Sequence, residues 1–479
     1  MTTPFNRSTI AAAVGMVALA FAAGHVCAAG FALQEQSGSG LGNAYAGGAA
    51  SAEDAATVWT NPAGMSKIKT NQVVAAINYI QPSMKFSNGL SLPATNQPLG
   101  GEGGDAGSGN WVPNLYLVVP INKDWTFGLG VNAPFGLVTE YDTGWIGRYQ
   151  AIKSDVKTMN INPAISWQAL PNLSLGAGAS YQQIKGTFTS NVNYSGALLS
   201  AAALNGIAPG SPTFNAIAQL TPGYDSFASV NGDDSAWGWN VGLLWDVNKD
   251  NRIGLAWRSD IDYHLTGNAD FTNPTVTVPP GTPAQLAGTI ALLSAGVNQQ
   301  KLYDGAITSD IKVPGVANVS WFGHVSDRWD VMADAQWTHW STLQYLTFVR
   351  TDGTGTLAQT PLFFKDTWRF ALGANYQYDK QWKFRMGVAY DQSPVQDTDR
   401  TPRLPDNDRT WLAGGVQYAF SPDVKFDFGA AYLWVKNGSI NDAGYDPSTG
   451  KSSVPAYGLI NGTYNNNVVI VSGQVTWNF

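Results

Sequence analysis

Several long segments of this chain alternate large apolar residues with small or polar ones, and no other feature restricts the possible folds as strongly. In WKFRMGVAYD (382–391), Trp382 and Phe384 belong to one phase, whereas Lys383 and Arg385 belong to the other. Successive side chains of a β-strand point to opposite faces, so the pattern predicts strands with one apolar face and one polar face. The same alternation recurs in 237–247, 368–378, 424–434 and 468–479.

The apolar phase of these segments begins and ends with Trp, Tyr or Phe. Strands of a transmembrane barrel carry aromatic residues where they meet the two membrane–water interfaces. A soluble sandwich or barrel also has alternating strands. The aromatic side chains are too bulky to fill a small interior, however, and the other phase of Gly, Ala, Asn, Gln and isolated charges suits a wet or partly filled lumen. The pattern therefore favours a membrane barrel over a soluble one.

Composition and the N-terminal segment support this interpretation. Charged residues make up 13% of the chain, about half the usual ~25%, and the net charge of −7 argues against a nucleic-acid partner. The longest apolar run, Ile10–Ala23, is too short for a spanning helix of about 20 residues. Arg7 precedes it and small residues flank Cys27, the only cysteine, so residues 1–28 are predicted to be a secretory signal peptide. Without a spanning helix, a chain that resides in a membrane must do so as a barrel.

Alternation and turn signals divide the remaining chain, residues 71–479, into about fourteen strands. An even number of strands puts both chain ends on the periplasmic side, with short turns there and long loops outside. The long segments 190–234 and 265–308 are then external loops. The predicted strands are 72–81, 111–121, 125–136, 158–169, 172–189, 235–248, 252–264, 309–324, 328–340, 362–379, 382–391, 408–420, 423–436 and 466–479.

Residues 29–70, before the first predicted strand, are rich in Gly, Ala and Ser and do not alternate. Ser51–Trp59 favours a helix, and Asn61 is placed to cap a further turn that starts at Pro62. The segment has too few apolar residues to fold alone, so it is predicted to plug the barrel lumen. A disordered linker is the alternative, and it would leave four apolar side chains exposed: Phe31, Leu33, Tyr45 and Trp59.

Six motifs, in order along nearly the whole chain, resemble the FadL/TodX family of outer-membrane transporters of hydrophobic compounds. They are AGF, SGLGNAYAGGAASAEDAATVWTNPA, VNAPFGLVTEY, KDTWRFALG, WKFRMGVAYDQSPV and LPDNDRTWLAGGVQYAF. The resemblance implies an all-β fold: a 14-stranded antiparallel transmembrane β-barrel in the bacterial outer membrane, with an N-terminal hatch in the lumen. It further implies capture of the substrate outside, an internal apolar site, and exit through a gap in the wall.

The resemblance also implies partners for the chain. These are a fatty acid or an aromatic hydrocarbon as ligand, outer-membrane lipids and lipopolysaccharide around the barrel, and the barrel-assembly machinery during insertion. Nothing in the sequence demands more than a monomer.

Two motifs are matched to the hatch and the lateral gap of the family. Asn61-Pro62-Ala63 matches the hatch motif, and Phe31 matches the hatch aromatic that reaches the internal ligand site. The gap is implied at Asn132, Pro134, Phe135 and Gly136, where the third strand kinks. Proline cannot donate to the ladder and glycine tolerates a close approach, so both residue types fit a break. The alternative is an ordinary strand end that runs into a loop.

Lumen cations are candidates for binding a carboxylate. Strand phase places Lys365, Arg369 and Arg385 inward, and the resemblance assigns Lys365 to ligand contact. Lys185 is a weaker candidate, because its phase follows outward-facing Tyr181 unless the strand bulges. The alternative is that each cation pairs with a lumen carboxylate; the candidates are Asp330, Asp334, Asp391 and Asp427. Gln183 stands where fatty-acid carriers have a basic residue, which leaves carboxylate recognition open.

Loop 265–308 contains a predicted helix for capture of the ligand outside. Thr282 and Gln285 have capping-box spacing, and Leu286, Ile290 and Leu293 share one helical face. Together with apolar residues of 190–234 they form either an exposed apolar groove or a cluster that packs on itself.

The chain carries no recognisable catalytic, metal-ligand or phosphate-binding motif, so no enzyme activity, cofactor or metal is predicted. Passive uptake of hydrophobic molecules, most simply long-chain fatty acids, is the predicted function. A monoaromatic hydrocarbon transporter of the same fold stays open as the alternative, and so does a diffusion porin for polar solutes.

Overall fold

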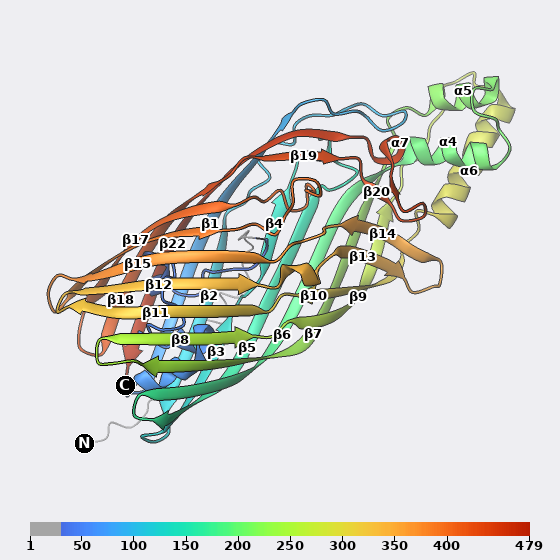
Figure 1. The fold of residues 1–479 in the computed structure, drawn as a ribbon. Coiled ribbons are helices and arrows are strands. Elements are labelled where there is room, and N and C mark those ends of the chain that lie inside the picture. Colours follow the sequence, from blue (N-terminus) through green and yellow to red (C-terminus); the bar gives the residue numbers. More distant parts are fainter. Residues whose placement is uncertain (1–29) are drawn as a thin grey trace.

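The computed structural model describes residues 30–479, so the predicted signal peptide, residues 1–28, lies outside the described residues. The described chain forms a long barrel with three helices projecting from one end and the C-terminus at the other (Figure 1). Within residues 30–479, no helix is both long enough and apolar enough to cross a membrane.

The wall is one closed sheet of 20 strand segments in which all neighbours are antiparallel. Six wall strands are each broken into two segments, which leaves fourteen strands, as predicted. The barrel closes where β1 pairs with β22 from Gln72 opposite Asn478 to Asn88 opposite Gly462. The wall consists of β1 (Gln72–Asn88), β2 (Asn110–Pro120), β3 (Trp125–Asn132) with β4 (Gly136–Glu140), β5 (Lys153–Leu170), β6 (Leu173–Asn193), β7 (Asp225–Asp246), β8 (Asn251–Arg258) with β9 (Ile261–Thr272), β10 (Gly305–Val313) with β11 (Val316–Ser326), β12 (Trp329–Thr338) with β13 (Tyr345–Arg350), β14 (Gly355–Pro361) with β15 (Thr367–Gln377), β16 (Trp382–Asp391), β17 (Arg409–Ala419), β18 (Val424–Val435) with β19 (Gly438–Asp442), and β22 (Ile460–Asn478).

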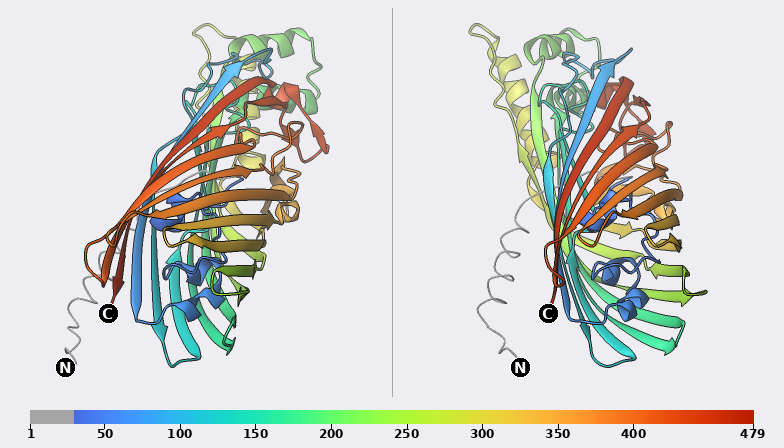
Figure 2. Two further views of the ribbon diagram at one scale, coloured as in Figure 1. Left: turned by 60° about the vertical axis from the view of Figure 1, so that its left-hand side comes forward. Right: turned by 90° about the vertical axis from the view of Figure 1, so that its left-hand side faces the viewer.

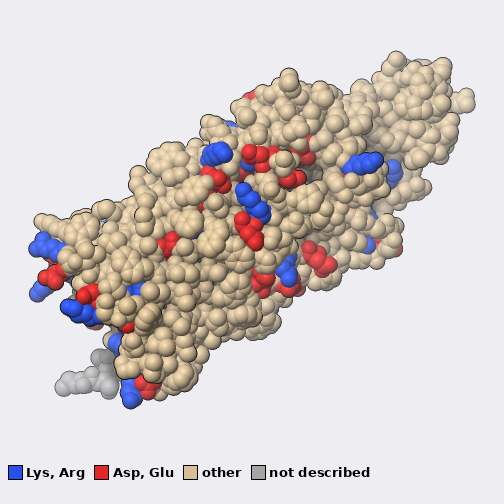
Figure 3. Space-filling view, in the orientation of Figure 1, with Lys and Arg blue, Asp and Glu red and all other residues tan. Residues whose placement is uncertain are grey.

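The two strand faces differ as the alternation predicts. In β16, Phe384 and Met386 are exposed on the outside, whereas Arg385 on the inside is 3% exposed. On the face in Figure 3, charged side chains gather at the end near the C-terminus and in a second zone further along. The surface between these zones is almost free of charge, which suits contact with lipid.

The strands on either side of the two long external connections extend further outward than predicted. β6 ends at Asn193 and β7 begins at Asp225, so the first long connection is 194–224 rather than 190–234. β9 ends at Thr272 and β10 begins at Gly305, which shortens the second connection to 273–304. In β9 the alternation continues with the opposite polarity, because Ile261, Tyr263 and Leu265 are buried and the exposed residues between them are polar. The ladder therefore persists after the apolar outward face has ended.

Three helices form the projecting tip: α4 (Tyr194–Leu204), α5 (Pro212–Leu220) and α6 (Ala284–Gln300). Ile290 and Leu293 are buried and Leu286 is partly buried in one cluster with α4 and α5. The predicted cluster that packs on itself is therefore confirmed for these side chains. The capping box was wrong: Pro283 occupies the N-cap, and the Thr282 hydroxyl donates to the carbonyl oxygen of Pro279 instead. The short helix α7 (Val454–Tyr457) and the hairpin β20–β21 (Tyr445–Asp446, Lys451–Ser452) lie on the same side of the barrel.

The segment that precedes β1, called the hatch below (residues 30–71), lies inside the barrel (Figure 2). It contains α2 (Gly38–Gly42), α3 (Thr57–Thr60) and the 3-10 helix η1 (Pro62–Lys67). The disordered linker is excluded for the described residues, because Phe31, Leu33 and Tyr45 are buried. Asn61 caps η1, as predicted, by accepting a hydrogen bond from the amide of Ala63.

The helix predicted over Ser51–Trp59 was mostly wrong, since only its last residues are helical. The wall satisfies this backbone in place of intrahelical bonds. Arg252 donates to the carbonyl oxygens of Ala50 and Ser51, and Gln72 accepts from the amide of Ala55. Lumen contacts thus override the local helix propensity.

Candidate functional site: the wall break and the hatch

The wall is interrupted between β3 and β4, as the Asn132–Gly136 stretch predicts. Asn132 pairs with Asn160 of β5 and Gly136 pairs with Lys157, so three residues of one strand oppose two of the other. The hydroxyl of Thr158 bonds to both the amide and the carbonyl of Phe135, at 2.9 and 2.7 Å, and holds the bulge in place. The prediction of an ordinary strand end is excluded, because β4 continues along the same neighbour.

On the side of β3 and β4 that faces β2, the break ends the ladder of hydrogen bonds. β2 pairs with β3 only as far as Leu115 opposite Val131. Beyond that point, residues 110–114 of β2 and 136–139 of β4 face each other without a ladder pair. The two strands bounding this gap pair with β1 and β5 on their other sides, so the wall has an unpaired seam here.

A short strand of the hatch fills part of the seam from inside. The amide of Leu33 donates to the carbonyl oxygen of Pro134 at 2.8 Å. The amide of Gly136 donates to the carbonyl oxygen of Phe31, also at 2.8 Å. Ala32 and Phe135 form the antiparallel bridge between these bonds. Backbone groups of the kinked strand that lack a neighbouring wall strand are thus satisfied by the hatch.

Aromatic rings surround the start of the hatch. The ring of Phe31 lies 4.9 Å from that of Trp340 and 5.7 Å from that of Phe135. Trp340 belongs to η2 (Trp340–Thr342), which interrupts the wall between β12 and β13 and carries the ring inward. Phe31 therefore occupies an apolar site next to the wall break, and its contact with a ligand stays a prediction.

A cage of amide side chains holds the hatch just after this strand. Asn78 and Asn114 each donate to the carbonyl oxygen of Glu35 at 2.9 Å. The side-chain oxygen of Gln36 accepts from Asn132 at 2.5 Å and from Tyr116 at 3.2 Å. Sequence reasoning missed this cage; the available signal was asparagine recurring in the inward phase of neighbouring strands.

Glu35 is the one charged residue of the hatch strand and cage, residues 31–36, and it is 1% exposed. Its Oε2 atom is buried without a hydrogen-bond partner among the described residues. Burial raises the pKa of Glu35 from 4.5 to about 7, although the charges of Arg409 and Arg369 oppose this shift. The carboxyl group is therefore close to half-protonated near neutral pH.

A small internal cavity of about 110 Å³ lies between the hatch and the wall beside the break. Leu33, Pro134 and Phe135 line it together with two cations, Arg258 and Arg369. The Arg258 guanidinium stacks 3.4 Å from the centre of the Trp59 ring and donates to the carbonyl oxygen of Trp59. The cavity thus combines apolar walls with positive charge.

The far end of the hatch is joined firmly to the wall through Asn61-Pro62-Ala63. The Asn61 amide donates to the carbonyl oxygens of Ala49 at 2.6 Å and Leu243 at 3.0 Å. A Cβ atom on Gly242 would lie 1.9 Å from the Asn61 oxygen, so this strand position admits only glycine. The motif therefore acts as a helix cap and as a wall contact at once.

The predicted lumen cations separate into different roles. Arg385 pairs with Glu53 of the hatch at 2.6 Å and with Asp427 at 2.8 Å, which is the ion-pair alternative. Arg369 is buried, donates to the carbonyl oxygen of Ala44 at 2.6 Å, and lines the internal cavity.

Both lysine candidates are exposed. Lys365 precedes β15, so the phase of that strand does not extend to it, and its inward direction stays a prediction. Lys185 is exposed because β6 runs past it without a bulge, which keeps it in the outward phase of Tyr181.

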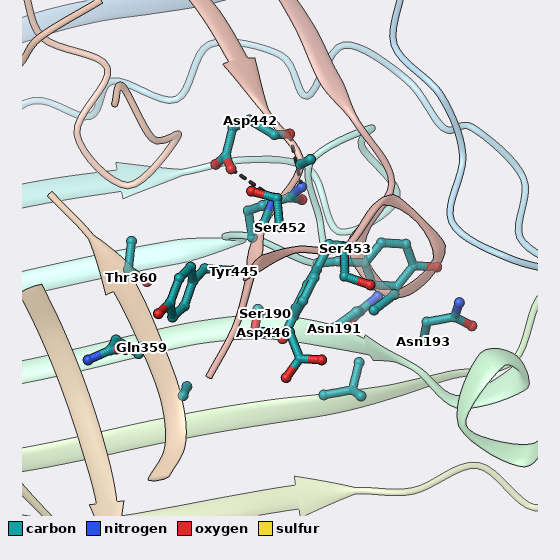
Figure 4. A pocket seen from close by; sticks show the side chains of 18 of the residues that line it. Ser190, Asn191, Asn193, Gln359, Thr360, Asp442, Tyr445, Asp446, Ser452 and Ser453 are labelled. Carbon is teal, nitrogen blue, oxygen red and sulfur yellow. Dashed lines mark hydrogen bonds between the residues drawn. The ribbon is translucent and has the colours of Figure 1, made fainter. Parts of the chain in front are cut away.

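A larger cavity of about 930 Å³ opens toward the helical tip (Figure 4). Its polar rim comes from the end of β6, from β14 and from the segment 442–453, as the labelled side chains show. Apolar side chains also line it, among them Phe188, Leu199 and Phe348. The molecule therefore has an outer cavity as well as the inner one beside the wall break.

Comparisons with known proteins agree with this architecture. The family model for "Outer membrane protein transport protein (OMPP1/FadL/TodX)" matches residues 19–479. The long-chain fatty acid transport protein of Escherichia coli K12 is 32% identical over 464 residues, which cover 94% of this chain and 97% of that protein. Outer membrane protein P1 of Haemophilus influenzae is 32% identical over 442 residues, with 90% of each chain covered.

Solved structures agree as well. A Pseudomonas aeruginosa FadL homologue has a TM-score of 0.79 at 26% identity, covering 94% of this chain and all of that one. The toluene transporter TbuX of Ralstonia pickettii shares the fold, with a TM-score of 0.59 at 19% identity and coverage of 91% of this chain and 96% of that one. With its hatch, its wall break and these relatives, the chain belongs to the OMPP1/FadL/TodX family of outer membrane transport proteins.

Proposed function

We propose that this protein takes up long-chain fatty acids passively across the bacterial outer membrane and releases them sideways through the break between β3 and β4. The observation that carries the proposal is the unpaired seam between β2 and β4, which the hatch strand Phe31–Leu33 fills in part from inside. An apolar ligand beside Phe31 and Phe135 would lie directly next to this seam. The relatives named as long-chain fatty acid transport proteins support the choice of substrate.

The driving force in this proposal is partitioning of the ligand into the membrane. Each CH2 group that leaves water contributes about 0.8 kcal/mol. Arg258 and Arg369 of the inner cavity are placed to hold a carboxylate while the acyl chain remains among the aromatic rings. Release then requires the hatch strand to leave the seam, because Leu33 and Phe31 occupy the backbone groups of Pro134 and Gly136.

Closing the seam tests the lateral route. Deletion of Ala133 combined with Pro134→Val removes the extra residue opposite β5 and supplies the missing amide donor, so β3 and β4 become one continuous strand. We expect the variant to bind oleate in detergent about as tightly as the natural chain. Uptake of labelled oleate by cells that depend on this protein should fall to the background of cells without it.

A control variant and three possible outcomes decide whether the result supports lateral release. A Pro134→Ala variant retains the bulge and should retain uptake, which separates closure of the wall from loss of the proline. Full uptake by the closed variant would contradict lateral release. Large steady single-channel currents from the natural protein in planar bilayers would instead favour a porin for polar solutes, and binding of toluene in preference to oleate would favour the aromatic-hydrocarbon alternative.

A further inference from the structure

The outer cavity contains one arginine that forms no ion pair within residues 30–479. Arg403 lies in the loop between β16 and β17 and lines the cavity together with Phe188 and Phe348. No carboxylate oxygen of residues 30–479 lies within 4.0 Å of its guanidinium nitrogens, whereas Arg148, Arg400 and Arg409 all have such a partner. A cation that lines a cavity and forms no ion pair is a candidate for binding an anionic ligand.

The hydrogen bonds of Arg403 leave one edge of the guanidinium free. Only Nη1 donates to the described chain, to the hydroxyl of Ser154 at 3.2 Å and to the carbonyl oxygen of Lys153 at 3.4 Å. Nε and Nη2 make no hydrogen bond within residues 30–479 and are not sealed from solvent. These two nitrogens form the fork that donates to both oxygens of a carboxylate.

Apolar surface for an acyl chain begins next to this fork. The guanidinium carbon lies 5.5 Å from the centre of the Phe188 ring, and that ring lies 5.5 Å from the ring of Phe348. Both rings line the same cavity, whose volume of about 930 Å³ is at the upper end of the range for ligand pockets. The carboxylate and the hydrophobic chain of one ligand could therefore bind at adjacent sites.

Three aspartates line the same cavity and oppose an anion there, Asp399, Asp446 and Asp442, and Asp442 is the one whose charge acts on Arg403. It lies beyond ion-pair distance of Arg403. It ends β19, which pairs with Ile460–Tyr464 of β22, outward of the apolar residues of β22 that face lipid. Burial raises the pKa of Asp442 to about 6, and burial lowers the pKa of Arg403 to about 10. The arginine stays protonated at neutral pH, and Asp442 weakens its attraction for a second carboxylate.

We propose that Arg403 is the residue of the outer cavity that recognises the carboxylate of an amphipathic ligand, with the acyl chain lying along Phe188 and Phe348. This inference rests on the proposed function and specifies its first step: the protein selects ionised fatty acids over neutral molecules of the same chain length. Recognition occurs before the ligand reaches the hatch. Arg258 and Arg369 of the inner cavity then belong to a separate binding site, which the ligand reaches later.

Binding of oleate and of oleyl alcohol to the purified protein tests this assignment, because the two ligands share the chain and differ in charge. Arg403→Gln should weaken oleate binding about tenfold, as expected for loss of a charge-assisted contact, and leave oleyl alcohol binding unchanged. Arg403→Lys keeps the charge and should retain most of the oleate affinity. Asp442→Asn removes the opposing charge while keeping an acceptor for the Gly444 amide, so it should tighten oleate binding.

Lys436→Gln is the control, since this exposed lysine lines neither the outer nor the inner cavity. It should leave the oleate affinity unchanged. Equal losses of both ligands in Arg403→Gln, or no loss of either, would overturn the assignment of Arg403. If the natural protein bound neither ligand, the proposed function itself would fail, and the two failures are thereby distinguishable.

Discussion

The two ends of the hatch are attached to the barrel by different kinds of interaction. The first end, residues 31–36, is held by two backbone bonds to the kinked strand, by neutral amide side chains and by aromatic contacts. The second end, residues 53–67, is held by buried ion pairs and by Asn61. The first end closes the wall break, and the second lies away from it. The difference indicates a hatch with one fixed end and one releasable end.

The energetics of the contacts agree with this division. A neutral hydrogen bond contributes about 0.5–1.5 kcal/mol net, and water can replace it when the strand moves away. Breaking one partner from a buried ion pair costs about 3–5 kcal/mol, because the remaining charge stays buried. Burial alone would raise the pKa of Glu53, but the charges of Arg385 and Lys383 outweigh it and hold that pKa well below 4.5. Glu53 therefore stays ionised over the range in which Glu35 titrates.

The largest effect should come from the fixed end. Arg385→Met leaves Asp427 buried without its ion-pair partner and leaves partly exposed Glu53 with Lys383 alone, and we expect the free energy of unfolding to fall by about 3–5 kcal/mol. Denaturant unfolding in detergent, followed by tryptophan fluorescence, measures this change. Lys383→Met is the control: Lys383 contacts only Glu53 and is partly exposed, so its loss should cost much less. Similar costs for both variants would contradict a fixed end built on Arg385.

The releasable end should respond to pH through Glu35. Its pKa is about 7 in the closed structure and 4.5 when exposed, so the closed hatch binds the proton more tightly. Closure is therefore strongest below about pH 4.5, weakens progressively as the pH rises to about 7, and changes no further above that. The total change is at most about 3 kcal/mol.

Hydrogen exchange at the amides of Leu33 and Gly136 reports this closure. Both amides should exchange faster at pH 7 than at pH 5 after correction for intrinsic rates. Glu35→Gln should abolish the pH dependence, while amides in the ladder between β16 and β17 provide the control in the same sample. A pH dependence that persists in Glu35→Gln would exclude Glu35 as its source.

The sequence predicted those features that depend on periodicity or on motifs, and it did not predict contacts between distant segments. The wall strands followed from alternation, because lipid on one side and a lumen on the other impose opposite demands on neighbouring residues. The kink at Asn132–Gly136 and the hatch aromatic Phe31 followed from motifs. The Glu35 cage could not be found in this way, because Asn78, Asn114 and Gln36 meet only once the strands are placed side by side.

Periodicity gave little information on charged residues that lie outside the strands or pair with the hatch. Phase predicted a lumen position for Lys365, but the strand begins after it, at Thr367. Phase did place Arg385 correctly, yet its partner Glu53 comes from the hatch, which periodicity cannot position. Arg403 lies outside any strand, so alternation gave no information about it.

An intermediate effect is expected at Asn61, where the cap and the wall contact coincide. Asn61→Ala removes the acceptor for the Ala63 amide and the donor to Ala49, and both groups remain buried. We expect a loss of about 1–3 kcal/mol in the free energy of unfolding. Limited proteolysis of the hatch should become detectable in this variant at lower denaturant concentration than in the natural chain. Asn96→Ala, which removes a hydrogen bond from the β1–β2 loop to Ala218 of α5, should leave hatch proteolysis unchanged.

The smallest effect is expected at Lys365, and it separates the hatch contacts from the ligand contacts. Lys365 is exposed, and it lines neither the inner nor the outer cavity. Lys365→Gln should therefore change neither the free energy of unfolding nor the oleate affinity, measured beside Arg403→Gln under the same conditions. A tenfold loss of oleate affinity in Lys365→Gln alone would mean that the ligand binds at the outer end of β15 and would move the anion site away from the cavity that contains Phe188.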